Sequence, residues 1–212
     1  MKRPISRVAA INDLSGFGRS SLAVIIPVLS TMGIQVCSVP TAVLSTHTGD
    51  FKGYSFVDLT DSMESFIAHW VQLKLEFDAI YSGFLGSPRQ VEIISRFIDD
   101  FAQKDTLVVV DPVMGDDGRL YDTMDQEMVR QMKNLISKAD LITPNITEAS
   151  LLLAEPFPQS ANERELKNWL LRLAEMGPDI VIITGVPDPI KNKHTMVMAY
   201  NKADGRFWKV SC

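Results

Sequence analysis

The chain has few cysteines and no long apolar runs. Its 212 residues include only Cys37 and Cys212, which form no spaced pair. This excludes a disulfide framework and a zinc site, and it predicts a reducing compartment. No segment is long enough to cross a bilayer, and the start MKRPISRVAAIND has too brief an apolar stretch for a signal peptide. We therefore expect a cytoplasmic protein without a membrane partner.

The chain also lacks an excess of positive charge. Lys and Arg number 21 against 26 Asp and Glu, giving a net charge of −5. This balance argues against a nucleic-acid partner. The hydrophobic fraction of 46% is ordinary for a globular protein. With no internal repeat, and with Glu155 to Glu163 interpreted as a loop leading into a helix, we expect a single domain over residues 1–212.

What the chain does contain is a regular alternation of apolar runs and helix-like segments. The predicted strands are Val8 to Ile11, Ile34 to Val39, Ala79 to Tyr81, Leu107 to Val110, Leu141 to Ile142 and Ile180 to Ile183. The predicted helices are Ser20 to Met32, Asp61 to Phe77, Pro88 to Gln103, Thr123 to Ser137 and Ala161 to Met176. This alternation predicts an α/β fold with a mostly parallel sheet and helices on both faces. Thr195 to Tyr200 and Arg206 to Val210 flank NKADG and predict an antiparallel hairpin.

Polar residues follow several of these strands directly. In LVVVDPVMGDDGRLY the apolar run stops at Asp111, because Pro112 cannot donate to a sheet. Thr143, Asn145 and Glu148 follow the next strand in LITPNITEAS. Thr184 and Gly185 follow the strand in IITGV. Ligands of open α/β sheets collect at the carboxyl ends of strands, so these residues predict a binding site.

The glycines after the first strand suggest a tight turn. NDLSGFGRSS places Gly16 and Gly18 before Ser20 and Ser21, and the backbone amides of such a turn could face a ligand. A dinucleotide-binding fingerprint would need glycine where Ser21 stands and an acidic residue near VCSVPT. The P-loop pattern Gly-Lys-Ser/Thr is absent as well, so neither nucleotide motif is predicted.

Each acidic residue at the strand ends has a structural alternative. Asp111 could simply end a strand, Asp116 and Asp117 could form a turn with Gly118, and Glu148 could favour a helix start. Taken together, however, three carboxylates at neighbouring strand ends would repel one another without a cation. Mg²⁺ with a nucleotide phosphate would balance this charge, which predicts phosphoryl transfer.

Four motifs carry a family resemblance: DPVMGD, TPNITEA, NDLSGFGRSS and STHTG. They resemble the pyridoxal/pyridoxine/pyridoxamine kinases of the ribokinase-like superfamily, and the resemblance extends from the first strand to the last residue. It implies a three-layer α/β sandwich, usually a homodimer. The implied reaction transfers the γ-phosphoryl group of ATP to the 5′-hydroxymethyl group of a vitamin B6 vitamer, with Mg²⁺ as cofactor.

The resemblance also implies roles for individual residues on the nucleotide side. The residues implied to hold Mg²⁺ are Asp111, Asp116 and Glu148. Those implied to contact the nucleotide or its phosphates are Asp111, Thr143, Asn145, Glu148, Thr184 and Gly185.

On the vitamer side the resemblance implies a second set of contacts. Asp13 stands where the family recognises the pyridine ring, and the implied neighbours of the vitamer are Thr48, Gly49, Phe84 and Tyr121. His47 has the chemistry of a catalytic base, but the resemblance favours a turn or packing role.

One family motif is not found in the chain. The Asp of G-x-G-D, the catalytic base of the family, is expected beyond Cys212, so the resemblance implies an incomplete C-terminal part. Three hypotheses follow: a B6 vitamer kinase, a hydroxymethylpyrimidine kinase of thiamin synthesis, or a short form that binds ligand without transferring phosphate. The DPVM-type motif is shared by the first two, and HTG with NDLSGFGRSS favours the first.

Overall fold

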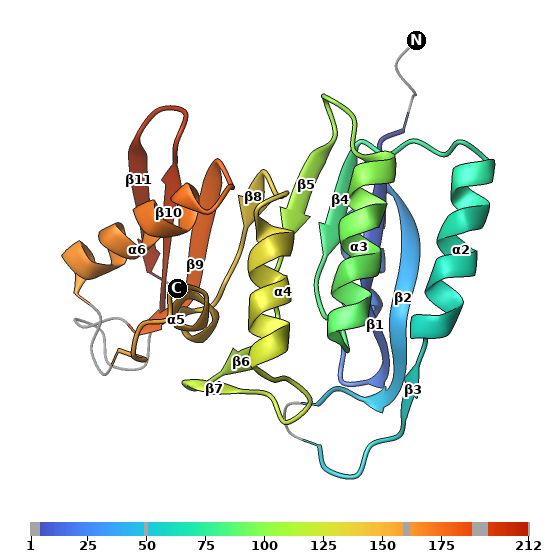
Figure 1. The fold of residues 1–212 in the computed structure, drawn as a ribbon, viewed down its shortest axis with the longest axis horizontal. Helices are drawn as coiled ribbons and strands as arrows, with labels where there is room; N and C mark the ends of the chain where they lie inside the picture. The colour runs from blue at the N-terminus through green and yellow to red at the C-terminus, as the bar shows by residue number, and fades with distance from the viewer. Residues whose placement is uncertain (1–4, 49–50, 159–161, 188–194, 212) are drawn as a thin grey trace. The chain divides into compact units, whose positions relative to one another are not determined.

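The computed structural model describes residues 5–48, 51–158, 162–187 and 195–211. The chain divides into two compact units, Met1–Val108 and Val109–Cys212, called here the N-terminal and C-terminal units (Figure 1). Within the described ranges, no helix is both long enough and apolar enough to cross a membrane. The single domain expected over residues 1–212 stays a prediction.

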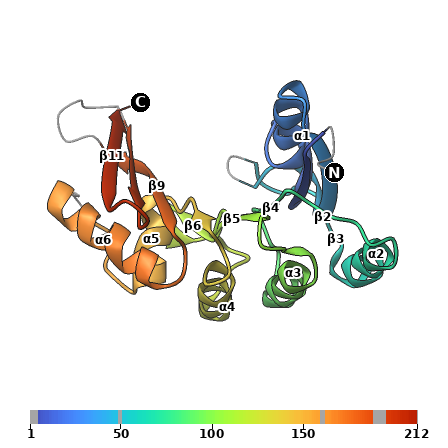
Figure 2. The same cartoon turned by 90° about the horizontal axis from the view of Figure 1, so that it is seen from above.

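The N-terminal unit contains a mostly parallel sheet in the order β4-β1-β2-β3. Its strands are β1 (Arg7–Phe17), β2 (Gln35–Thr46), β3 (Phe56–Asp58) and β4 (Ala79–Ser82). Strand β1 pairs in parallel with β2 and β4, whereas β3 pairs antiparallel with β2. Its helices are α1 (Leu22–Thr31), α2 (Thr60–Gln72) and α3 (Pro88–Phe101). Helix α1 lies on one face of this sheet and α2 and α3 lie on the other (Figure 2).

The C-terminal unit contains strands in the order β5-β8-β9-β10-β11, although the first two residues of β5 precede the boundary of the unit at Val109. They are β5 (Leu107–Val110), β8 (Leu141–Ile142), β9 (Ile180–Pro187), β10 (Thr195–Asn201) and β11 (Arg206–Ser211). The first three run parallel, and the last two form the predicted antiparallel hairpin. A separate two-stranded hairpin joins β6 (Gly115–Asp116) to β7 (Arg119–Leu120). The helices are α4 (Gln126–Ile136), α5 (Ile146–Leu153) and α6 (Glu163–Glu175), and α6 packs on β9 and β10.

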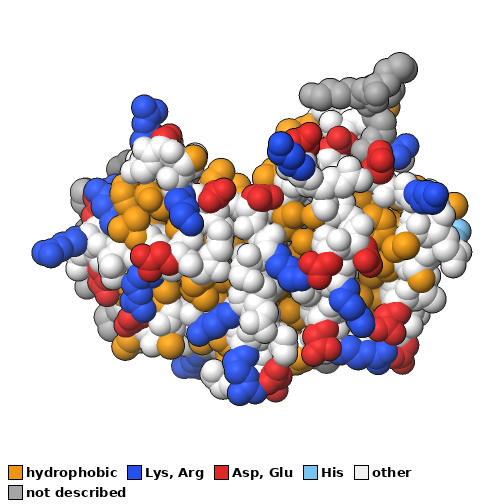
Figure 3. Space-filling view, turned by 45° about the horizontal axis from the view of Figure 1, so that its top comes forward, with side chains coloured by type: hydrophobic (Ala, Val, Ile, Leu, Met, Phe, Trp, Pro, Cys, Tyr) orange, Lys and Arg blue, Asp and Glu red, His pale blue; other side chains and the backbone are white. Residues whose placement is uncertain are grey.

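The surface carries charges of both signs. Figure 3 shows Lys and Arg side chains interspersed with Asp and Glu side chains on the face drawn. Several pair with each other, among them Arg89 with Asp61 at 2.7 Å and Lys167 with Glu163 at 2.8 Å. Mixed charge of this kind is typical of a solvated protein surface.

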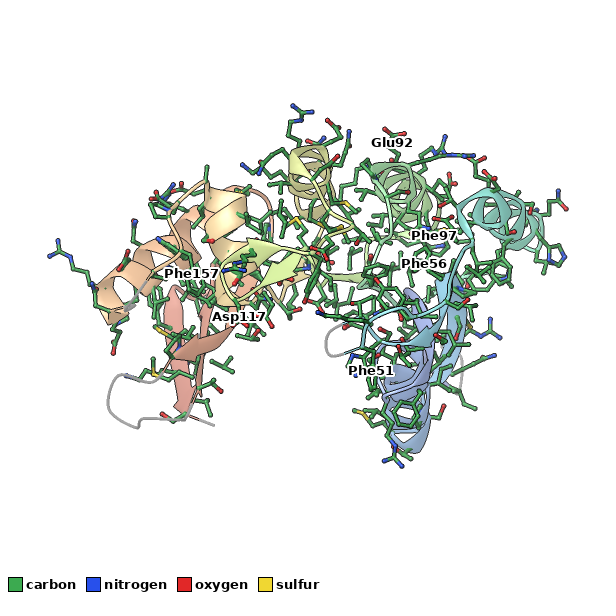
Figure 4. All side chains as sticks on the ribbon, turned by 90° about the horizontal axis from the view of Figure 1, so that it is seen from below. Phe51, Phe56, Glu92, Phe97, Asp117 and Phe157 are labelled. Carbon is green, nitrogen blue, oxygen red and sulfur yellow. The ribbon has the colours of Figure 1, made fainter. Side chains whose placement is uncertain are left out.

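Helix α3 illustrates how the sequence pattern produces the core. Pro88 stands in its first turn, and the Ser87 side chain caps it by accepting a hydrogen bond from the Gln90 N–H at 3.3 Å. Phe97 points toward the strands and is fully buried, whereas Glu92 points away (Figure 4). The ring of Phe97 lies 4.5 Å from that of Phe101. The helix therefore holds an aromatic core against the sheet.

The predicted fold class is confirmed, because each unit combines helices with three strands that run parallel, β4-β1-β2 in one and β5-β8-β9 in the other. Two strands extend well beyond their predicted ends: β1 continues past Ile11 to Phe17, and β2 continues past Val39 to Thr46. Gly16 therefore lies inside a strand rather than in the predicted turn, and a Cβ there would lie 3.2 Å from the Ser45 carbonyl oxygen. The turn begins at Gly18, whose φ of 107° suits glycine.

Other boundaries differ for local reasons. Helix α2 ends at Gln72 rather than Phe77, since Lys74 adopts a left-handed φ of 52°. Helix α4 begins at Gln126 rather than Thr123, because the Asp125 carboxylate caps the Met128 N–H at 2.9 Å. The short strands β3, β6 and β7 were not predicted. Two or three residues carry no periodicity from which a strand can be inferred.

Candidate functional site

A polar pocket of about 310 Å³ lies in the C-terminal unit where its parallel strands end. Its lining residues are Asp111, Val113, Tyr121, Thr143, Asn145, Glu148 and Thr184. Backbone hydrogen bonds join the strand ends: the Thr143 N–H donates to Val110 O at 3.2 Å, and the Thr184 N–H donates to Pro144 O at 2.9 Å. The structure thus brings together most of the residues predicted for the nucleotide. Tyr121, predicted as a vitamer contact, lines the same pocket, and Val113 was not predicted.

The start of α5 shapes the floor of this pocket. The Asn145 side chain accepts a hydrogen bond from the Glu148 N–H at 2.8 Å, and the Glu148 carboxylate accepts one from the Asn145 N–H at 2.8 Å. The other Glu148 oxygen accepts from the Met114 N–H at 3.1 Å, and Asn145 Nδ2 donates to Gly115 O at 2.8 Å. The first turn of α5 therefore fixes the DPVMGD loop.

Burial perturbs the acidic groups of the pocket. Glu148 is only 3% exposed, and its burial raises the pKa of the carboxyl to about 8, although backbone N–H groups oppose the shift. Burial raises the pKa of Asp111 to about 6, opposed by the hydrogen bond with Thr143. Burial also raises the pKa of Tyr121 to about 12, assisted by the charge of Glu148. Both carboxylates would be stabilised in their ionised forms by a cation in the pocket.

Asp116 lies outside this pocket. It is exposed at the β6–β7 hairpin, where its carboxylate accepts a hydrogen bond from the Asp117 N–H at 2.9 Å. Asp117 and Gly118 adopt φ of 49° and 75°, so they form the turn named above as the structural alternative. Figure 4 shows Asp117 beside Phe157, and a Cβ on Gly118 would lie 2.9 Å from the Phe157 ring.

The predicted metal ligands are therefore not a preformed cluster of three. Among the residues that the structure describes, no three His, Cys, Asp or Glu side chains lie close enough to hold a metal ion. Asp111 and Glu148 do line one pocket with the oxygens of Thr143 and Asn145. This donor set fits Mg²⁺, which uses one or two carboxylates and completes its shell with water and phosphate oxygens.

Gly185 follows Thr184 in β9 but does not line the pocket. It is exposed, has a φ of 65°, and a Cβ there would meet nothing nearer than Asn145 Cβ at 4.0 Å. Its left-handed backbone explains the glycine.

The N-terminal unit holds the predicted vitamer residues Asp13 and Phe84. Asp13 is 5% exposed in β1, and its carboxylate accepts a hydrogen bond from the Ser15 hydroxyl at 2.9 Å. The Asn12 side-chain oxygen accepts from the Asp13 N–H at 3.1 Å and from the Phe84 N–H at 2.9 Å. Asn12 and Ser15 were not predicted as site residues. The only signal was the presence of three polar residues, Asn12, Asp13 and Ser15, directly after an apolar run.

The STHTG segment is only partly described. Thr48 is half-buried, and Gly49 lies outside the described residues. The His47 ring packs edge-on against Phe51, with centroids 4.9 Å apart. A Cβ at Gly18 would lie 2.1 Å from the His47 ring, which explains glycine there. These contacts agree with the packing role expected for His47.

The fold and the pocket are together those of an α/β ligand-binding protein whose site lies at the carboxyl ends of parallel strands. The chain matches the phosphomethylpyrimidine kinase family over residues 26–211, and it belongs to this family. This agrees with the resemblance to pyridoxal kinases of the ribokinase-like superfamily.

Two solved structures illustrate the likeness. A Bacteroides thetaiotaomicron protein described as a phosphomethylpyrimidine kinase, crystallised in one form with pyridoxal, is 55% identical with a TM-score of 0.95. In that comparison 98% of this chain covers 72% of the other. Pyridoxal kinase from Lactobacillus plantarum is 32% identical with a TM-score of 0.87, and 98% of this chain covers 72% of it.

Two of the similar curated proteins have names that denote different activities. The thiamine biosynthetic bifunctional enzyme of Arabidopsis thaliana is 26% identical over 191 residues, which is 88% of this chain and 35% of that protein. Pyridoxal kinase of Ovis aries is 28% identical over 166 residues, which is 74% of this chain. The chain spans 51% of the sheep enzyme, so it corresponds to about half of that relative.

Proposed function

We propose that the protein is an ATP-dependent kinase that phosphorylates the 5′-hydroxymethyl group of vitamin B6 vitamers. The observation that carries the proposal is the pocket at the strand ends of the C-terminal unit, where Asp111 and Glu148 lie among hydroxyl and amide groups. Buried carboxylates beside neutral donors suit a metal-bound polyphosphate, whose charge the metal ion balances. The homodimer and the cytoplasmic location expected from the sequence stay predictions.

On the nucleotide side, each pocket residue has a proposed part. Asp111 and Glu148 would hold Mg²⁺ directly or through its waters, and the ion would supply charge neutralisation for the transferring phosphoryl group. Thr143 and Asn145 donate to phosphate oxygens, and Thr184 and Gly185 border the nucleotide. Asp116 lies outside the pocket, so it would contribute to Mg²⁺ binding only through its exposed carboxylate.

On the vitamer side, Asp13 is the proposed recognition group. Its carboxylate would accept a charge-assisted hydrogen bond from the protonated ring nitrogen or from the ring hydroxyl. Phe84 would pack against the ring, and Thr48 and Gly49 complete the contacts proposed within the N-terminal unit. Tyr121, the other residue implied by the resemblance, lines the pocket of the C-terminal unit. The 55% identical Bacteroides thetaiotaomicron structure with pyridoxal supports this choice of substrate.

A second candidate is a hydroxymethylpyrimidine kinase of thiamin synthesis. It is favoured by the family's description and by the likeness to the thiamine biosynthetic enzyme of Arabidopsis thaliana. Both substrates are small aromatic nitrogen rings bearing a hydroxymethyl group, so one acidic residue such as Asp13 could serve either.

Calorimetric titration of the 212-residue chain separates the candidates by binding. Mg-ATP, pyridoxine, pyridoxamine and hydroxymethylpyrimidine are titrated separately. We expect binding of Mg-ATP and of both vitamers, with hydroxymethylpyrimidine bound more weakly. Preference for hydroxymethylpyrimidine would favour the thiamin candidate. A complete gene product that binds these ligands without releasing ADP would support the short form that transfers nothing.

A further inference from the structure

A buried side-chain amide connects the two predicted ring contacts of the N-terminal unit. Asn12 lies in β1 and is 5% exposed. Its side-chain oxygen accepts hydrogen bonds from the backbone N–H groups of Asp13 at 3.1 Å and of Phe84 at 2.9 Å. One oxygen atom thus fixes the backbone of two residues that are 71 positions apart in the sequence.

The sheet itself does not hold Asp13 in a regular ladder. Asn12 is paired with Pro40, which has no N–H, and the register between β1 and β2 shifts between Asn12 and Leu14. At this irregular position the Asn12 side chain supplies the acceptor for the Asp13 N–H. Loss of that acceptor would leave a buried donor unsatisfied and the Asp13 backbone less constrained.

Phe84 is held from both sides. Its N–H donates to Asn12, and its carbonyl oxygen accepts from the Thr41 hydroxyl at 2.9 Å. Gly83 leaves room for the amide, because a Cβ there would lie 2.1 Å from Asn12 Nδ2. The backbone N–H of Gly83 donates to Ile11 O at 2.9 Å, so the segment after β4 is tied to β1 next to Asn12.

We propose that Asn12 is a positioning residue for vitamer recognition, which sets the Asp13 carboxylate and the Phe84 ring in one arrangement. This inference rests on the proposed function. Asn12 does not itself contact the vitamer; it acts through the two backbone N–H groups that it accepts. A site fixed in this way loses little conformational entropy on binding, so preorganisation increases affinity.

The test compares four variants of the 212-residue chain by calorimetry and by thermal unfolding. Asn12→Leu removes the accepting oxygen at similar size, and Asn12→Asp retains an oxygen at the same place. Asp13→Ala removes the proposed recognition group itself. Thr106→Val is the matched control, because the buried Thr106 hydroxyl donates to Phe77 O at 3.0 Å and accepts from the Gln103 N–H at 3.1 Å.

We expect Asn12→Leu to raise the Kd for pyridoxine about tenfold, equivalent to one strong hydrogen bond, and to leave the Kd for Mg-ATP within about twofold. Asn12→Leu and Thr106→Val should lower the melting temperature by similar amounts. Thr106→Val should nevertheless leave the Kd for pyridoxine unchanged. Asn12→Asp should bind pyridoxine more tightly than Asn12→Leu.

Three outcomes would overturn the positioning role of Asn12. They differ in whether the proposed function is overturned as well. If Asn12→Leu binds pyridoxine as the unmodified chain does while Asp13→Ala does not, Asn12 is only structural and the proposed function stands. If Thr106→Val weakens pyridoxine binding equally, the effect of Asn12 is a general loss of stability. If the unmodified chain binds no vitamer, the proposed function fails and the positioning role fails with it.

Discussion

The side chains of Asn145 and Glu148 each accept a hydrogen bond from the other's backbone N–H, at 2.8 Å in both directions. This reciprocal pair begins α5, and the same two side chains also hold Met114 and Gly115 of the DPVMGD loop. Helix start, acidic loop and pocket wall therefore depend on two residues. Their contribution to stability and their contribution to ligand binding can be separated experimentally.

Asn145→Ala should lower both stability and nucleotide affinity. Loss of a helix cap costs about 1 kcal/mol of unfolding free energy, and the Gly115 carbonyl also loses its donor. Asn162→Ala is the matched control, since Asn162 caps α6 by accepting from the Glu165 N–H at 2.9 Å. Urea unfolding should show a lower free energy of unfolding for both variants, with the larger loss for Asn145→Ala, while calorimetry should show weaker Mg-ATP binding only for Asn145→Ala. If the two variants bind Mg-ATP equally well, Asn145 serves only as a helix cap.

The stability of the chain should fall as pH rises toward 8. The pKa values of Glu148 and Asp111 are raised on folding, from 4.5 to about 8 and from 3.8 to about 6. The folded chain thus keeps protons that the unfolded chain has released, so its free energy of unfolding is largest below about pH 4 with respect to these groups and declines through the folded pKa values.

Glu148→Gln tests this pH dependence, because glutamine keeps an accepting oxygen but does not titrate. The free energy of unfolding in urea should vary less between pH 5 and pH 8 for the variant than for the unmodified chain. The control is Glu127→Gln, because Glu127 is partly exposed and hydrogen bonds from Arg130 and Gln131 lower the pKa of its carboxyl. If the free energy of unfolding of Glu148→Gln depends on pH as strongly as that of the unmodified chain, Glu148 is already ionised in the folded chain.

Asp111→Asn should reduce the dependence of ATP binding on Mg²⁺. Asp111 lines the pocket, whereas Asp116 is exposed at the hairpin turn. We expect the gain in ATP affinity on adding Mg²⁺ to shrink by about tenfold or more in Asp111→Asn, as for a lost charge-assisted contact. The same gain should persist in Asp116→Asn. If Asp116→Asn loses more of this Mg²⁺-dependent gain in ATP affinity than Asp111→Asn, the three-carboxylate metal site expected from the sequence would be supported instead.

Asp13→Ala should weaken vitamer binding selectively. A charge-assisted hydrogen bond contributes roughly 1.5 to 3 kcal/mol, so the Kd for pyridoxine should rise by more than tenfold while that for Mg-ATP stays nearly constant. Asp61→Ala is the control, because its carboxylate is exposed on α2 and pairs with Arg89. Parallel changes for both ligands in Asp13→Ala would exclude a recognition role for Asp13.

The pocket proposed for the nucleotide was largely predictable from the sequence. Strands β5 and β8 match their predicted bounds, because each apolar run is closed by a polar residue and a proline, as at Asp111 and Pro112. Parallel strands then bring their carboxyl ends to one edge. This is why Thr143, Glu148 and Thr184 meet in the predicted pocket.

The remaining site residues could not be placed from the sequence, because their positions depend on contacts that leave no periodic pattern in it. Asp116 was grouped with Asp111 as a carboxylate at the strand ends and through the family resemblance, but the β6–β7 turn places it in solvent. The polar residues Asn12, Asp13 and Ser15 were taken as the end of a strand, yet they continue β1 while buried. Their burial is possible because side-chain hydrogen bonds satisfy them, and such bonds connect residues far apart in the sequence.

The identity of the substrate is tested most directly by a single steady-state comparison. Release of ADP by the complete product of the gene is measured with Mg-ATP and either pyridoxine or hydroxymethylpyrimidine, and the two kcat/KM values are compared. We predict the larger value for pyridoxine, with both activities lost in Asp111→Asn. A larger value for hydroxymethylpyrimidine would contradict the assignment to vitamin B6.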